Sequence, residues 1–232
     1  MKIDRSQRSP NHQPRPADTP IDMLVLHYTG MPSAEAALAR LCDPAAEVSA
    51  HYLIHQDGRV LALVDEDRRA WHAGQSFWRG QRDINSRSIG IELVNPGHEF
   101  GYQPFPDAQM DSLTRLAGQI LDRHPIPARN LVGHADIAPQ RKQDPGELFA
   151  WQELARLGIG LWPSETNAGI QAPRDVGALL RRWGYQAAEP AEISAAMVAF
   201  QRHFRPSCLD GQADAESLAR LASLLAMVEN SG

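Results

Sequence analysis

Two histidines and one aspartate in this sequence stand where the side chains of an α/β protein can converge on a metal ion. His27 directly follows the short apolar run at residues 23–26, and His134 follows a second such run at residues 130–133. Asp144 lies ten residues beyond His134, in a segment rich in proline and glycine. Ligand sites of α/β folds gather at such strand-to-loop junctions. Two imidazoles and one carboxylate would leave the fourth position of a zinc ion open to water, which is typical of a catalytic site.

The segments around these residues alternate between strand-like and helix-like patterns. Asp57-Gly58 predicts a hairpin turn between two of the strands, and Leu113, Leu116 and Ile120 fall on one face of the longer helix. We expect strands at residues 23–26, 51–55, 60–64, 88–94 and 130–133, and helices at 34–41 and 107–123. Strands interleaved with helices indicate an α/β fold with a mixed central sheet flanked by helices.

After Trp151 the pattern changes to helices alone. Residues 163–172 show no apolar periodicity, so we expect a linker there. Helix-like segments follow at residues 174–183, 191–204 and 213–228. The predicted organisation is a flexible N-terminal tail at 1–20, a main α/β domain at 21–162, the linker, and a small all-α three-helix bundle at 173–232. The bundle is near the lower size limit for independent folding.

The composition limits the classes of partner. The formal net charge of −5 and a pI near 6.0 give no electrostatic reason to expect nucleic acid. No apolar run reaches the roughly 18 residues that suggest a membrane span. The first twenty residues have a basic start and four prolines but no apolar segment, which favours a tail over a secretory signal. The expected location is therefore the cytoplasm, with the cell envelope as the alternative if the true start lies upstream.

The two cysteines point to no disulfide framework and no cysteine zinc site. Cys42 and Cys208 are far apart, and neither belongs to a CxxC pair. Both are interpreted as small apolar residues. The sequence indicates no oligomeric state, and a monomer is compatible with it.

Six short blocks in a fixed order resemble a known family of hydrolases. The blocks are 27–29 (HYT), 49–54 (SAHYLI), 71–74 (WHAG), 88–92 (SIGIE), 133–139 (GHADIAP) and 141–146 (RKQDPG). In this order they resemble the zinc-dependent N-acetylmuramoyl-L-alanine amidases, which include peptidoglycan-recognition proteins and phage lysozyme-like amidases. The nearest likeness is to the AmiD-type amidases of bacteria, and it covers about residues 20 to 160. It implies the sheet-and-helix fold of that family.

The resemblance assigns roles to five residues. It makes His27, His134 and Asp144 the zinc ligands, with Zn²⁺ as the cofactor. Glu92 matches the family's acidic residue beside the metal, where it can take a proton from water and pass it to the leaving amine. Lys142 matches a basic residue that can stabilise an oxyanion. The alternatives are an exposed strand position for Glu92 and a solvated surface position for Lys142.

Other polar residues receive less specific roles. Tyr28, Trp71 and His72 are candidates for substrate contact, with simple packing as the alternative. His51 and His55 are expected to be structural, and His98, His124 and His203 to face solvent. Many relatives carry a basic residue before the Val-Ser-Ala-His block, where this chain has Glu47. Arg79, Arg82 and Arg87 are the nearby candidates to supply that charge.

The resemblance implies hydrolysis of the amide bond between N-acetylmuramic acid, or its 1,6-anhydro form, and L-alanine. The substrate would be peptidoglycan or muropeptide fragments in cell-wall turnover and recycling. The C-terminal bundle resembles the three-helix peptidoglycan-binding module through residues 198–201 and 209–211. A non-catalytic recognition protein that binds muropeptides in the same cleft is the alternative. A structural zinc protein is a third hypothesis, but no fourth His or Cys stands at a suitable spacing.

Overall fold

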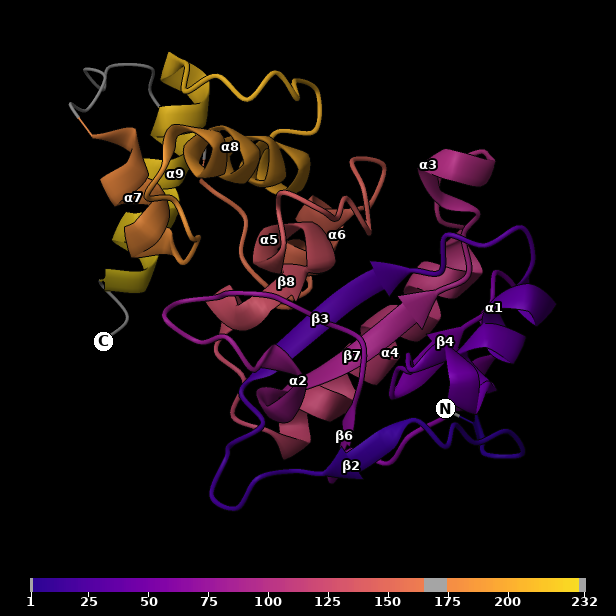
Figure 1. Ribbon diagram of the computed structural model, residues 1–232. Helices are drawn as coiled ribbons and strands as arrows, with labels where there is room; N and C mark the ends of the chain where they lie inside the picture. The colour runs from indigo at the N-terminus through magenta and orange to yellow at the C-terminus, as the bar shows by residue number, and fades with distance from the viewer. Residues whose placement is uncertain (1, 165–174, 230–232) are drawn as a thin grey trace.

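The computed structural model describes residues 2–164 and 175–229. Its main sheet has six strands in the order β1-β5-β4-β7-β3-β8, and β2 pairs with β6 in a separate ribbon (Figure 1). The strands are β1 Ile3–Asp4, β2 His12–Pro14, β3 Met23–Tyr28, β4 Tyr52–Ile54, β5 Val60–Ala62, β6 Arg68–Ala70, β7 Ser88–Leu93 and β8 Leu131–Gly133. Only β4 and β5, the predicted hairpin, pair in antiparallel fashion within the main sheet. The mixed sheet confirms the predicted fold class.

The helices of the described residues cover the sheet on two sides. They are α1 Ala34–Cys42, α2 Ile84–Arg87, α3 Gly97–Phe100, α4 Asp107–Arg123, α5 His134–Ile137, α6 Trp151–Arg156, α7 Val176–Trp183, α8 Pro190–Phe204 and α9 Ala215–Glu229. Short 3-10 turns occur at Pro44–Ala46 and Ala128–Asn130. None of the helices in this described part of the chain is long and apolar enough to cross a membrane.

The central strand β3 fixes where the site forms. It is buried from Met23 to His27, as expected for a parallel strand with covered faces. Its register pairs His27 with Glu92 of β7, and Leu26 with Gly133 of β8. The carboxyl ends of three neighbouring strands therefore bring His27, Glu92 and the residue after Gly133 to one edge of the sheet.

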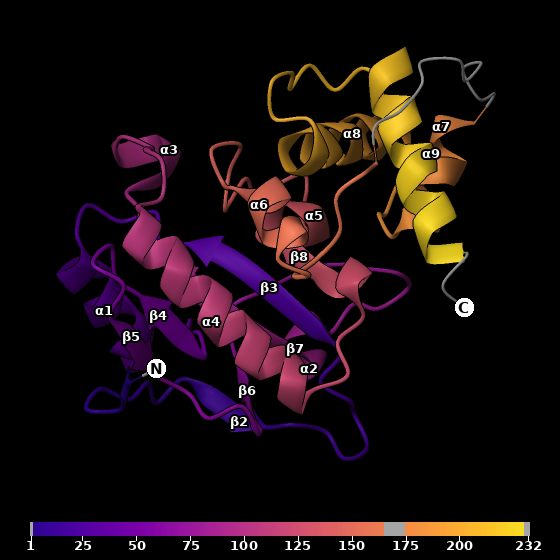
Figure 2. The same cartoon turned by 180° about the vertical axis from the view of Figure 1, so that it is seen from behind.

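One face of the sheet is covered by α4, which runs along it (Figure 2). Leu113, Leu116 and Ile120 of this helix are buried in one cluster with Leu24 and Leu26 of β3. The predicted helix at 107–123 is confirmed at both ends. Its apolar stripe thus anchors the strands that carry the site.

The opposite face of the sheet is covered in part by the C-terminal helices. Side chains alternate along a strand, so Met23 and Val25 point away from α4. They belong to one buried cluster with Trp183 of α7, Phe200 of α8 and Leu221 of α9. The three predicted helices are present (Figure 1). Their buried core is continuous with that of the sheet. The predicted linker lies outside the described residues from 165 onward.

The prediction of a flexible tail at residues 1–20 is wrong. In the structure β1 extends the main sheet beside β5, and β2 pairs with β6. Asn11 is 2% exposed and donates hydrogen bonds to the main-chain oxygens of Asp43 and Val48. Arg15 donates to the main-chain oxygens of Ser86 and Ser88. Polar side chains anchor this segment to distant backbone, so no apolar periodicity reveals it.

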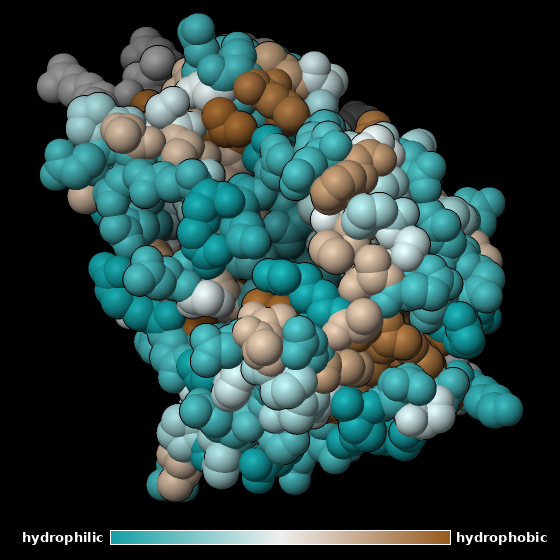
Figure 3. All heavy atoms as spheres, turned by 45° about the vertical axis from the view of Figure 1, so that its right-hand side comes forward, coloured by the Kyte–Doolittle hydropathy of each residue, from teal (hydrophilic) through white to brown (hydrophobic). Residues whose placement is uncertain are grey.

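Hydrophilic side chains predominate on the face shown in Figure 3, and hydrophobic ones form small patches there. The larger apolar side chains lie mostly in the three buried clusters. Some polar side chains are nevertheless buried, and several of these surround His27.

Candidate metal centre

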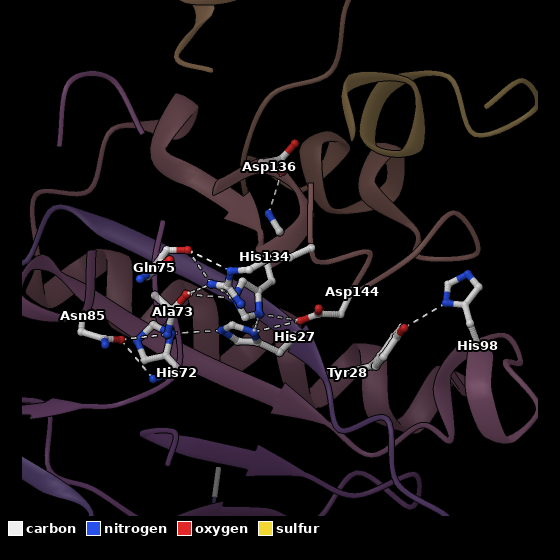
Figure 4. A network of polar contacts seen from close by, with 12 residues as sticks. His27, Tyr28, His72, Ala73, Gln75, Asn85, His98, His134, Asp136 and Asp144 are labelled. Carbon is white, nitrogen blue, oxygen red and sulfur yellow. Dashed lines mark hydrogen bonds and ion pairs between the residues drawn. The ribbon is translucent and has the colours of Figure 1, made fainter. Parts of the chain in front are cut away.

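Three buried side chains meet at the carboxyl ends of β3 and β8. His27 Nδ1 lies 3.0 Å from both His134 Nδ1 and Asp144 Oδ2. His134 Nδ1 lies 3.1 Å from the same carboxylate oxygen. All three side chains turn toward one point (Figure 4). The structure thus brings together the three residues that the sequence singled out.

Local backbone contacts hold the aspartate against the histidines. His134 is the first residue of α5, directly after β8. The Ala135 amide donates to the main-chain oxygen of Asp144 at 2.9 Å, which returns the loop to the start of α5. A side chain at Gly133 would place its Cβ 2.7 Å from Pro145, so only glycine lets the loop approach this closely.

The outer ring nitrogen of each histidine has its own partner. His134 Nε2 donates to the main-chain oxygen of Ala73 at 3.1 Å, so its Nδ1 carries the lone pair. The Ser88 hydroxyl donates to the main-chain oxygen of Ile84, so it accepts from His72 Nε2 at 3.1 Å. His72 Nδ1 is then an acceptor for His27 Nε2–H at 3.0 Å. His27 therefore also presents a lone pair on Nδ1.

Burial and the neighbouring side chains shift the pKa values of His27, His72 and Asp144. Burial lowers the pKa of His27 to about 4, and it lowers the pKa of His72 as well. Burial raises the pKa of Asp144, but the neighbouring His134 and His27 outweigh it, and the net shift is downward. In the tautomers described above, His27 Nδ1, His134 Nδ1 and the Asp144 carboxylate aim their lone pairs at one point. This donor set fits a divalent metal ion with nitrogen and oxygen ligands.

Glu92 lies beside this group and has a shielded carboxylate oxygen. The side chain as a whole is half-buried, but Oε2 is out of contact with solvent and has no hydrogen-bond partner among the described residues. Burial, with the charge of Asp144, raises the pKa of Glu92, and Lys142 offsets only part of this. The exposed strand position considered for Glu92 is thereby contradicted. An unpaired carboxylate facing the site is suited to hold or release a proton.

A polar cleft of about 420 Å³ opens beside this group, and His134 and Asp144 lie in its wall. Most of the predicted site residues line it: Tyr28, Trp71, His72, Glu92, His134, Lys142 and Asp144. Lys142 is exposed, and no hydrogen bond or ion pair with another described residue fixes its ammonium group. Its positive charge lowers the pKa values of both His27 and Glu92, so it acts on the site.

Comparison with known proteins identifies this arrangement. The sequence matches the family of N-acetylmuramoyl-L-alanine amidases over residues 17–147. It is 42% identical to the N-acetylmuramoyl-L-alanine amidase AmiD of Escherichia coli, across 88% of this chain and 82% of that protein. The chain belongs to the N-acetylmuramoyl-L-alanine amidase family. The predicted resemblance and the prediction of an amide hydrolase are confirmed.

Solved structures agree with the family. An E. coli AmiD complex with anhydro-N-acetylmuramic acid-L-Ala-D-γ-Glu-L-Lys matches with a TM-score of 0.81 and 41% identity, covering 93% of each chain. AmpDh3 of Pseudomonas aeruginosa also matches with a TM-score of 0.81, at 34% identity over 99% of each chain. In sequence, the chain is also 38% identical to the 1,6-anhydro-N-acetylmuramyl-L-alanine amidase AmpD of E. coli. That match covers 64% of this chain and 88% of AmpD.

Tyr28, Trp71 and His72, the candidate substrate contacts, all line the cleft but differ in how far they are buried. Tyr28 is half-buried on the cleft wall, and its hydroxyl lies 2.9 Å from His98 Nδ1. Burial, with the charge of Asp144, raises the pKa of Tyr28 to about 12, so the phenol stays neutral. Trp71 is also half-buried at the cleft. His72 is 8% exposed and is bonded on both ring nitrogens, so its main contact is with His27.

The expected environments of the other histidines hold only in part. His51 is structural as predicted, because its Nδ1 accepts from the Gly90 amide and its Nε2 donates to the Arg68 carbonyl. The prediction that three histidines face solvent is wrong: His98 contacts Glu147, His124 contacts Glu66, and His203 is 5% exposed beside Asp136. In each case a carboxylate from a distant segment covers the ring, which the sequence could not reveal.

The arginines that line the cleft are not the ones expected from the sequence. Arg79, Arg82 and Arg87 do not line it; Arg87, for example, pairs with Asp22. Arg40 of α1 and Arg141 line it instead. Arg141 is tied to the main-chain oxygens of Ala73 and Gln75, whereas Arg40 is exposed. The only signal for Arg40 was its place in the helix that follows β3.

Proposed function

We propose that this chain is a zinc-dependent amidase that cleaves the bond between N-acetylmuramic acid, or its 1,6-anhydro form, and L-alanine. Its substrate would be peptidoglycan or muropeptides in cell-wall turnover and recycling. The observation that carries the proposal is the convergence of His27, His134 and Asp144 beside the unpaired carboxylate of Glu92. The relatives solved with an anhydromuramoyl tripeptide or pentapeptide support the choice of substrate.

His27 Nδ1, His134 Nδ1 and the Asp144 carboxylate would hold the zinc ion. When bound, zinc polarises the scissile carbonyl and acidifies water. The protein contributes fixed ligand orientation, because the outer nitrogens of both histidines are already occupied. Little reorganisation is then needed when the metal binds.

Glu92 and Lys142 would carry out the chemistry around the amide. Glu92 would accept a proton from the attacking water at its unpaired Oε2 and deliver it to the leaving amine. Its raised pKa favours the protonated form needed for that delivery. Lys142 brings the cation that stabilises the negative charge on the carbonyl oxygen. Tyr28 and Trp71 would line the walls against which the substrate lies.

The decisive experiment incubates the full chain with defined muropeptides and follows the products by mass spectrometry. We expect zinc-loaded protein to release a peptide with a free L-alanine amino terminus, and protein treated with a chelator to leave the substrate intact. Readdition of zinc should restore release. Intact substrate that stays bound to the zinc-loaded protein would overturn the proposal and favour the recognition protein considered above.

A further inference from the structure

The segment that carries His134 is closed by one buried carboxylate. Asp136, two residues after the ligand, is 2% exposed. Its Oδ2 accepts the main-chain amide of Gly133 at 2.8 Å, which folds the turn between β8 and α5 (Figure 4). His134 lies inside this turn. The direction of its ring therefore depends on where the Asp136 carboxylate is held.

The C-terminal helices supply the groups that hold this carboxylate. The Tyr185 hydroxyl, just after α7, donates to Asp136 Oδ1 at 2.6 Å. His203 Nδ1, on α8, donates to Asp136 Oδ2 at 2.8 Å. Both side chains are buried, with exposures of 1% and 5%. A buried carboxylate depends strongly on its donors, because water cannot replace them.

Aromatic packing prevents the two donors from turning away. The His203 ring is stacked between Trp151, at a centroid distance of 3.7 Å, and Phe204, at 3.9 Å. The Tyr185 ring meets Trp78 edge-on at 5.2 Å. The bundle and the sheet share one buried cluster around these contacts. This packing leaves neither ring room to rotate away from Asp136.

We propose that Tyr185 and His203 are positioning residues for the metal centre, and that they act on His134 through Asp136. The C-terminal helices are then part of the hydrolytic unit, whatever they contribute to binding peptidoglycan. This inference rests on the zinc site of the proposed function. Groups that hydrogen-bond a ligand directly typically change metal affinity by about 10- to 100-fold. Tyr185 and His203 act through Asp136 and the Gly133 amide, so we expect an effect toward the lower end of that range or below it.

The test compares variants that separate the hydrogen bond from the packing. Tyr185→Phe keeps the ring and removes the hydroxyl. His203→Phe keeps the stacked ring and removes the donor, whereas His203→Asn keeps a donor near the Nδ1 position and loses the stack. Gln201→Leu is the matched control, because Gln201 is fully buried on the same helix and bonds to Asp210 and Gln212, not to Asp136.

Two readouts are taken on the full chain: zinc affinity by competition with a chromophoric chelator, and exchange of the Gly133 amide hydrogen in the metal-free protein. We expect Tyr185→Phe and His203→Phe each to weaken zinc binding by about three- to tenfold and to speed Gly133 exchange. His203→Asn should retain most of the affinity. Gln201→Leu should lower the melting temperature and leave both readouts unchanged.

Zinc affinity within about twofold of wild type in Tyr185→Phe would overturn the inference, as would equal losses in Gln201→Leu. Tyr185→Phe removes one oxygen atom only, so it decides the matter even if a histidine variant does not fold. If the wild-type chain binds no zinc, the proposed function fails. Gly133 exchange in the metal-free protein then still shows whether Tyr185 and His203 hold the turn.

Discussion

Replacing His72 by phenylalanine removes the acceptor for His27 while keeping a ring of similar size. In the structure His72 Nδ1 accepts a hydrogen bond from His27 Nε2–H, and His72 Nε2–H donates one to the Ser88 hydroxyl. Ser88 keeps its bond to Ile84 in the variant, so the loss falls mainly on His27. His27 is 1% exposed, and no water can take the place of His72 there.

The size of the effect follows from the orphaned N–H group. A buried donor without a partner costs about 1–3 kcal/mol, so the metal-free variant should be less stable by that amount. His27 can also place its proton on Nδ1, which removes its lone pair from the site. We expect zinc affinity to fall about 10- to 100-fold, or about 1.4–2.7 kcal/mol.

The assay combines chelator competition for zinc with urea unfolding of the metal-free chain. His72→Asn is the matched control, since its amide oxygen can accept near the position of Nδ1. Nitrogen-detected NMR of the imidazoles reports the His27 tautomer directly. Wild-type zinc affinity in His72→Phe, together with an unchanged His27 tautomer, would refute the reasoning. A raised KM with intact zinc binding would instead return His72 to the substrate-contact role expected from the sequence.

Three further changes test other parts of the molecule. Glu92→Gln should give folded, zinc-binding protein with kcat lower by about 10²- to 10⁴-fold, and near wild-type turnover in a muropeptide assay would remove Glu92 from the mechanism. Burial raises the pKa of Glu66, but hydrogen bonds led by Arg123 outweigh it and bring the pKa to about 2, below the ordinary value of 4.5. The ionised Glu66 carboxylate therefore stabilises the fold above pH 4.5, and this stabilisation is lost as the pH falls toward 2. Between about pH 7 and pH 3, wild type should lose more of its free energy of unfolding in urea than Glu66→Gln does. Equal losses in the two proteins would contradict this. Asn11→Ala should lower the free energy of unfolding by about 1–3 kcal/mol in urea titrations, whereas no change would mean that the N-terminal segment is not anchored.

The secondary structure was largely predictable because its signals are local. The apolar run before His27 and the stripe of Leu113, Leu116 and Ile120 each reflect a repeat that a single strand or helix imposes on its own residues. His27 and His134 could be singled out because a strand end followed by a polar residue is also a local pattern, whereas the role of Asp144 came from the resemblance to the family. The family blocks added the order in which those residues occur.

The sequence by itself thus determined the longer strands and helices, the family and the three side chains that meet at the candidate metal centre. The tertiary structure alone decided what holds them. It made His72 a hydrogen-bond partner of His27, covered His203 beside Asp136, and paired β1 and β2 with strands distant in the sequence. The hydrogen bond between His27 and His72 joins residues 45 positions apart, and the one between Asp136 and His203 joins residues 67 positions apart. A hydrogen bond between distant residues leaves no periodic trace in the chain, because its existence depends on which surfaces folding buries together.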